Sequence, residues 1–145
     1  MAELLLIARM GGRRIAFPAS EIEGVVELEG LTPAPRAAPH VAGLSALRSR
    51  VLTVIDGLAS LGIGCTDAAQ LGDAIVVPSG GHPYALLVEE VEDVVEASGA
   101  PVAARASIGV GWDRVAIGMV EAEGELYLLV DPHLLVAGPA AAAAA

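Results

Sequence analysis

The feature that most constrains this chain is an internal repeat. Residues 7–28, IARMGGRRIAFPASEIEGVVEL, align without a gap with residues 76–97, VVPSGGHPYALLVEEVEDVVEA, at an offset of 69. Each segment contains an apolar run, a Gly-Gly pair, a second apolar run, an acidic step and a closing run of Val-Val-Glu. Self-similarity over this length indicates that one supersecondary unit occurs twice in the chain.

Glycine pairs divide the two apolar runs of each copy. Gly11 and Gly12 occupy this place in the first copy, and Gly80 and Gly81 occupy it in the second. Glycine adopts positive φ without a Cβ clash, so each pair predicts the two-residue turn of a β-hairpin. We therefore interpret these four glycines as structural.

The later parts of the two copies also correspond. Residues 43–56 align with residues 118–131 at an offset of 75, and each segment ends in an apolar strand followed by aspartate. Short apolar segments follow Asp56 and Asp131, and Pro132 stands directly after the second aspartate. Aspartate is a favoured helix N-cap and proline suits the first helical position. The pattern predicts two capped short helices rather than two catalytic acids.

Each copy contains about five short strands, with proline-bearing connections at residues 30–40 and 98–109. Short strands separated by turn residues, with hardly any helical periodicity, are typical of small all-β barrels. A copy of this size alone would have a marginal core, which favours two barrels fused through a hydrophobic seam. We expect half-barrels at about 1–65 and 70–136, with or without exchange of strands, and an alanine-rich tail at 137–145.

Charge and composition exclude several classes of partner. The net charge is −10, from 18 acidic and 8 basic residues, and every basic residue is arginine. Phosphate backbones and anionic membranes would repel such a chain, so neither nucleic acid nor membrane insertion is expected. Cys65 is the single cysteine, which leaves no disulfide or paired-cysteine metal site. No apolar run reaches the length of a membrane span, and we expect a cytoplasmic protein.

The sequence contains no group of residues with the spacing of a catalytic or metal-binding site. His40, His82 and His133 lack ligand spacing, and no nucleophile elbow or phosphate-binding loop is present. We interpret the acidic residues between 89 and 96 as a solvated edge, with calcium binding as a remote alternative, and Trp112 as a packing residue. The chain is therefore expected to need no cofactor, to lack enzymatic activity and to bind other proteins.

The segment GLSALRSRVLTVID, residues 43–56, resembles the signature of CheW-like domains, which runs Gly-h-h-Asn-Leu-Arg-Gly-x-h-h-Pro-h-h-Asp with h apolar. The matching residues are Gly43, Leu47, Arg48, Val51, Val54, Ile55 and Asp56. The residues that depart from the signature are Ala46, Ser49 and Thr53, in place of Asn, Gly and Pro. Flanking segments also resemble that family, so the resemblance covers roughly residues 3–136. Gly24 stands where relatives commonly carry glutamate.

The resemblance implies a fold of two interlocked five-stranded SH3-like barrels. It also implies a non-enzymatic adaptor that couples the cytoplasmic tips of chemoreceptors to the histidine kinase CheA in bacterial receptor arrays. A stand-alone adaptor is the best match, because the 145 residues contain neither a kinase nor a receiver domain. An adaptor of a pilus-motility or developmental system is the nearest alternative, and a barrel that binds a metabolite is less favoured.

The resemblance also implies which residues meet partners. Arg48 matches the family arginine that is implied in coupling to partners. An equally weighted alternative is that Arg48 only holds the turn in place within the protein. The receptor-facing surface is expected between the barrels, at positions matching Ile22, Gly43 and Val91, with ordinary packing as the alternative for the two aliphatic residues. The kinase-facing surface is expected on the apolar edge of the first barrel. Arg50 falls at a variable family position and is expected to be a solvated charge at the strand edge.

Overall fold

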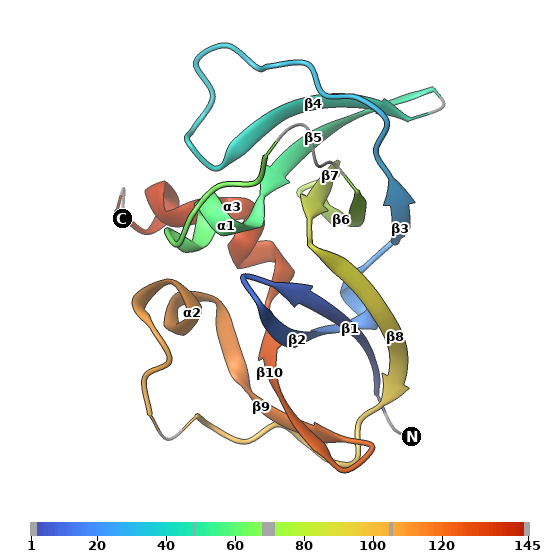
Figure 1. Cartoon of the computed structure of the whole chain (residues 1–145), viewed down its shortest axis with the longest axis vertical. Helices are drawn as coiled ribbons and strands as arrows, with labels where there is room; N and C mark the ends of the chain where they lie inside the picture. Colours follow the sequence, from blue (N-terminus) through green and yellow to red (C-terminus); the bar gives the residue numbers. More distant parts are fainter. Residues whose placement is uncertain (1–2, 48, 68–71, 105, 144–145) are drawn as a thin grey trace.

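The computed structural model describes residues 3–47, 49–67, 72–104 and 106–143. The elements within these ranges are strands β1 (Leu4–Met10), β2 (Arg13–Pro18), β3 (Gly24–Glu27), β4 (Val41–Leu47), β5 (Arg50–Asp56), β6 (Asp73–Ser79), β7 (His82–Leu87), β8 (Glu90–Glu96), β9 (Ala116–Ala122) and β10 (Glu125–Val130), and helices η1 (Ala19–Glu21), α1 (Gly57–Leu61), α2 (Val110–Val115) and α3 (Pro132–Ala143). Figure 1 shows two curled sheets, one above the other, with α1, α2 and α3 along one side.

Each five-stranded sheet combines strands from both halves of the chain. Barrel A has the order β8-β1-β2-β10-β9, and barrel B has the order β3-β6-β7-β5-β4. Replacing β1 to β5 by β6 to β10, and the reverse, converts one order into the other. The sequence repeat is therefore also a structural repeat, and the all-β prediction of two interlocked five-stranded barrels is confirmed.

The hairpin turns follow directly from the glycine pairs. Gly11 and Gly12 have φ of 61° and 75°, and Gly80 and Gly81 have φ of 58° and 78°. Positive φ at both central residues gives a turn whose twist matches that of the flanking strands. These turns fix the registers of β1 with β2 and of β6 with β7.

The two proline-bearing connections are each tied to a terminal strand of a barrel. Thr32 forms an isolated bridge with Leu44 of β4, and Val102 forms the equivalent bridge with Met119 of β9. In each bridge both backbone hydrogen bonds are present, at 2.7 and 2.8 Å. Long connections that lack secondary structure are thus held in place by backbone pairing.

The central hydrophobic core is shared by the two barrels. It includes Phe17 and Leu128 from barrel A and Ile75 and Leu86 from barrel B, all nearly inaccessible to solvent. Two smaller clusters lie within barrel A and barrel B respectively. Because buried apolar surface dominates folding stability, the shared core joins both barrels into one cooperative unit.

Short helices follow both aspartates of the repeat. Asp56 is the N-cap of α1, and its side chain accepts hydrogen bonds from the amides of Leu58 and Ala59. Asp131 accepts one from the amide of His133, in the first turn of α3. Helix α3 is interrupted at Gly138, which has φ of 76° and ψ of 172°. Among the described residues, no helix combines the length and apolar character needed to span a membrane.

Candidate protein-binding surface

Ile22 and Val91 lie where the chain crosses from one barrel to the other. Ile22 stands between β2 of barrel A and β3 of barrel B, and Val91 begins the return of the chain into β8 of barrel A after β7 of barrel B. Both side chains are half-buried and pack against the shared core. The offset of 69 makes the two positions equivalent, so the repeat places an aliphatic residue at each crossover.

Gly43 is buried beneath the first proline-bearing connection. A Cβ atom at this position would overlap the carbonyl oxygen of Thr32, and φ of 154° is a conformation that side-chain-bearing residues rarely adopt. Gly118 has the same relation to the carbonyl of Val102. Both glycines allow the bridging segment to approach the terminal strand closely. Gly43 thus allows the backbone at Thr32 to pack directly on β4.

Two arginines, Arg48 and Arg50, stand at the start of the apolar run that ends at Asp56. Arg48 lies outside the described residues, so its role stays a prediction. Arg50 is exposed at the first residue of β5, as a solvated charge at a strand edge would be, and its guanidinium also forms an ion pair with Glu23 at 2.6 Å. The backbone amide of Glu23 in turn donates to the carbonyl of Val76 at 2.8 Å. Two strands separate β3 from β5 in the sheet order, so this ion pair shows how tightly barrel B curls.

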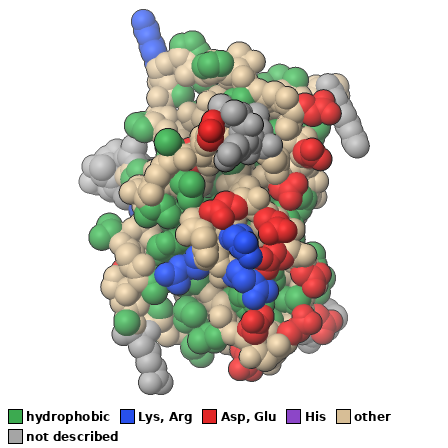
Figure 2. Space-filling model, viewed as in Figure 1, with side chains coloured by type: hydrophobic (Ala, Val, Ile, Leu, Met, Phe, Trp, Pro, Cys, Tyr) green, Lys and Arg blue, Asp and Glu red, His purple; other side chains and the backbone are tan. Residues whose placement is uncertain are grey.

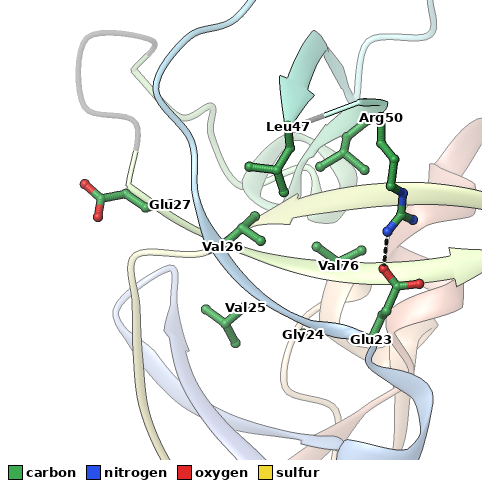
Figure 3. A pocket seen from close by; sticks show the side chains of 9 residues that line it. Glu23, Gly24, Val25, Val26, Glu27, Leu47, Arg50 and Val76 are labelled. Carbon is green, nitrogen blue, oxygen red and sulfur yellow. Dashed lines mark hydrogen bonds and ion pairs between the residues drawn. The ribbon is translucent and has the colours of Figure 1, made fainter.

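A groove of about 500 Å³ lies beside this ion pair. Its lining residues are Glu23, Gly24, Val25, Val26, Glu27, Leu47, Arg50, Leu52 and Val76. Figure 3 shows the aliphatic side chains gathered along β3 and β6, with the Arg50–Glu23 pair at one end. Strand β3 is a terminal strand of barrel B and pairs only with β6. We call this surface, together with the neighbouring Val51, the β3 edge surface.

Exposed aliphatic residues make the β3 edge surface suitable for binding a protein. Val25 of β3 is 43% exposed, and Val51 of β5 is 57% exposed. A terminal strand offers unpaired backbone groups, and neighbouring apolar side chains add area that a partner can bury. The surface therefore has the composition of a docking edge.

Barrel A uses a different set of charges at the equivalent place. Glu92 and Glu125 occupy the repeat positions of Glu23 and Arg50, and Arg14 binds both, at 2.6 and 3.2 Å. Arg9 adds a contact with Glu92 at 3.2 Å. Within the acidic edge of residues 89–96, Glu92 is thus engaged in ion pairs, and its side chain is only 18% exposed.

Hydrogen bonds in this cluster shift three pKa values. The hydrogen bond from Tyr127, assisted by the charge of Arg14, lowers the pKa of Glu125 below its usual range. The same bond to Glu125, together with burial, raises the pKa of the Tyr127 hydroxyl. The pKa of Arg14 is raised chiefly by its hydrogen bond with Glu92. The cluster is thus most stable with Glu125 ionised and the phenol of Tyr127 protonated.

Histidine side chains make structural contacts. His40 is buried, with Nε2 at 2.9 Å from the carbonyl oxygen of Val136. His82 contacts Thr53 at 3.2 Å, and His133 contacts Glu21 at 2.7 Å. Within the described ranges, no group of three or more His, Cys, Asp or Glu residues is placed to hold a metal ion.

Comparisons with known proteins agree with the fold. The curated protein "Chemotaxis protein CheW" of Rhizobium meliloti (strain 1021) is 31% identical over 132 residues, which cover 83% of this chain and 85% of that protein. The crystal structure of the scaffolding protein TtCheW from Thermoanaerobacter tengcongensis has the same fold, with a TM-score of 0.73 and 18% identity over 93% of this chain and 92% of that one. The family model of the CheW-like domain matches residues 4–139, and the chain therefore belongs to the CheW-like domain family.

Proposed function

We propose that this protein is a non-enzymatic adaptor that couples chemoreceptors to the histidine kinase CheA in a bacterial chemosensory array. The observation that carries the proposal is the family match over residues 4–139. The adaptor acts in the cytoplasm and reaches the membrane through its partners. Chemotaxis is the proposed process, in agreement with the name of the Rhizobium relative.

The receptor is proposed to bind along the junction between the barrels, near Ile22 and Val91. These residues occupy equivalent crossovers, and both pack on the core that the two barrels share. A partner at this junction contacts both barrels at once, so it can sense or fix their relative placement. Arg48 is proposed to contribute a bidentate contact to a receptor carboxylate or carbonyl.

The kinase is proposed to bind the β3 edge surface. CheA carries a regulatory domain of the same family, so edge-to-edge docking would pair two similar barrels. Val25 and Val51 supply exposed apolar area, and β3 supplies a terminal strand. Burial of this area should dominate the affinity, so moderate salt should weaken kinase binding only slightly.

A two-partner titration tests the proposal. The protein is titrated with the regulatory domain of the CheA from its own cell and, separately, with a receptor's cytoplasmic hairpin tip. We expect micromolar binding to both. Val25→Asp and Val51→Asp should weaken kinase binding about tenfold or more and leave receptor binding unchanged, because they place a charge in an apolar contact.

The repeat offers matched controls for these variants. Val94 and Leu126 are the equivalents of Val25 and Val51 in barrel A, and both are similarly exposed. Val94→Asp and Leu126→Asp should therefore retain kinase binding. Arg48→Ala should weaken binding of the receptor tip and leave binding of the CheA domain unchanged. Binding to neither partner by the folded wild-type protein would contradict the array-coupling function in that pathway.

A further inference from the structure

A second exposed surface lies on the side of the molecule opposite β3 and β8 (Figure 1). It is formed by the end of α1, by α2 and by the turn of the β1–β2 hairpin. We call it the helical face and define it by Arg13, Ile63, Val110, Arg114 and Pro139. Neither the receptor nor the kinase surface proposed above includes any of these residues.

Helices α1, α2 and α3 are fixed relative to one another at this face. The guanidinium of Arg114 donates to the carbonyl oxygen of Leu134 at 2.8 Å, and to the carbonyl and hydroxyl oxygens of Ser60 at 2.8 and 3.0 Å. A Cβ atom at Gly111 would overlap the carbonyl of Leu61, so α1 and α2 meet at their backbones. Because these helices are already fixed, a partner that binds here would cost the surface little conformational entropy.

The helical face exposes aliphatic side chains that the fold does not use. Val110, at the start of α2, is 91% exposed, and Ile63 is 49% exposed. Both line a groove of about 450 Å³, together with Pro139 and the last residues of α1. A contiguous apolar patch of this kind marks an interaction site on a globular protein.

Arg13, beside this patch, is an exposed cation that forms no ion pair within the described part of the chain, whereas Arg114 donates its hydrogen bonds to oxygens of Leu134 and Ser60. Arg9, Arg14 and Arg50 each pair with a glutamate. Arg13 instead lies over the ring of Trp112, at 5.6 Å from the ring centroid, and contacts no carboxylate of the described residues. Figure 2 shows basic side chains grouped near the centre of this view, with acidic side chains directly beside several of them. In a chain of net charge −10, such a cation favours a partner that brings a carboxylate.

The apolar and cationic parts of the helical face are contiguous. A Cβ atom built on Gly11, in the hairpin turn, would lie 2.8 Å from Cδ1 of Ile63 and 3.7 Å from Cζ2 of Trp112. Ile63 therefore lies beside the Trp112 ring, over which the guanidinium of Arg13 is placed. Arginine side chains are enriched among the residues that dominate binding energy, and the buried Trp112 ring holds Arg13 in place beside Ile63.

We propose that the helical face docks an amphipathic helix of a protein partner, with aliphatic side chains along one side and a carboxylate beside them. Ile63 and Val110 contact the aliphatic side chains, and Arg13 binds the carboxylate. A helix fits better than a strand, because β1 and β2 are interior strands of barrel A and offer no free backbone edge. The proposal does not depend on the array-coupling function.

Intrinsic fluorescence gives a direct test, because Trp112 is the only tryptophan in the chain. The probe is a stapled 16-residue synthetic helix with leucines along one face and glutamates beside them, compared with the same helix carrying lysines. We expect saturable binding of the acidic helix only. Val110→Asp should weaken binding about tenfold and Arg13→Gln about fivefold. Val94→Asp, an equivalent change on the opposite side, should alter binding less than about twofold.

Amide chemical-shift mapping locates the bound helix. We expect shifts at Gly62, Val110 and Gly111, with none along β3. Absence of saturable binding, equal binding of both peptides, or shifts confined to barrel B would overturn the proposal. A concentration-dependent fluorescence change without peptide, removed by Val110→Asp, would show that a second copy of the chain covers the face and would also overturn it. Urea unfolding of each variant confirms that the comparison is made between folded proteins.

Discussion

At the scale of single residues, the two copies use equivalent positions with different chemistry. Glu23 and Arg50 of barrel B meet in a direct ion pair, whereas barrel A has Glu92 and Glu125 at the same positions. Two carboxylates repel each other, so barrel A needs a cation between them, and Arg14 provides it. The alignment identifies these positions as equivalent, but only the curled sheets show that each set of charges meets.

The lowered pKa of Glu125 predicts that this residue contributes to the loss of folding stability at acid pH. Its pKa is lowered in the folded state by the hydrogen bond from Tyr127 and by the charge of Arg14. A lowered folded pKa stabilises the protein above the unfolded pKa of Glu125, and this stability is lost as the pH falls through the folded value. Glu125→Gln should therefore lose less stability than the wild type on acidification below about pH 4.5.

Urea unfolding at a series of pH values measures this effect. Glu121→Gln, at an exposed glutamate of β9, is the matched control and should keep the wild-type dependence. The same pH dependence in Glu125→Gln and in the wild type would contradict the assignment.

Gly43 gives a prediction that depends on one backbone contact. Gly43→Ala would bring a Cβ atom onto the carbonyl of Thr32 in an unfavourable backbone conformation. We expect it to lower the free energy of unfolding by about 3 kcal/mol. Gly30→Ala has open space around the added Cβ and should change stability by less than about 0.5 kcal/mol. Chemical denaturation followed by circular dichroism measures both, and equal stabilities would refute the close-packing role.

At the scale of elements, α1 is held by more than its own helical bonds. Besides capping the helix, Asp56 accepts hydrogen bonds from the amide and hydroxyl of Thr66, at 2.7 and 2.8 Å. The aspartate therefore joins the start of α1 to the segment that follows the helix. The carboxylate of Asp131 accepts a hydrogen bond from the amide of His133 and, within the described part of the chain, from no distant residue, so this side chain serves α3 locally.

Removing the two caps should have unequal effects. Asp56→Ala leaves half-buried donors of α1 and Thr66 without their acceptor, so we expect a loss of about 2–3 kcal/mol in the free energy of unfolding. Asp131→Ala should cost about 1 kcal/mol. Asp56→Asn keeps an acceptor oxygen and should recover part of the loss. Urea midpoints measure all three, and equal losses for the two alanine variants would contradict the extended role of Asp56.

Helix α2, like the three-residue η1, is an element that the sequence pattern did not predict. Its N-cap is Gly109, which offers no side-chain oxygen, and the helix has only six residues. A short helix gains its stability from tertiary packing rather than from intrinsic propensity. Here that packing is the burial of Trp112 and the backbone contact of Gly111 with Leu61, which no local sequence signal reveals.

At the scale of the whole molecule, the exchange of hairpins makes the two barrels interdependent. Barrel A takes β1 and β2 from the first half of the chain and its other strands from the second, and barrel B has the reverse arrangement. The shared core further joins them. Neither half of the chain contains all the strands of any barrel, so we infer that the halves cannot fold independently.

Fragments 1–67 and 68–145 test this inference. Each alone should show neither a cooperative unfolding transition nor dispersed amide resonances. An equimolar mixture should recover both, because every strand pairing is then available. Independent folding of either fragment would contradict the interdependence, and the intact chain should unfold in a single transition in urea.

The sequence by itself determined the repeat, the hairpins at the glycine pairs, the helices after Asp56 and Asp131, and the likeness to the family. These features depend on neighbours along the chain, where turn chemistry and capping act over a few residues. Tertiary structure alone decided that β2 pairs with β10 and β5 with β7, and it thereby placed Arg50 against Glu23 and left Arg13 beside an apolar patch. The same local hairpins fit either an exchanged or an unexchanged arrangement. The choice between them rests on which apolar faces are buried together, and contacts between distant segments govern that burial.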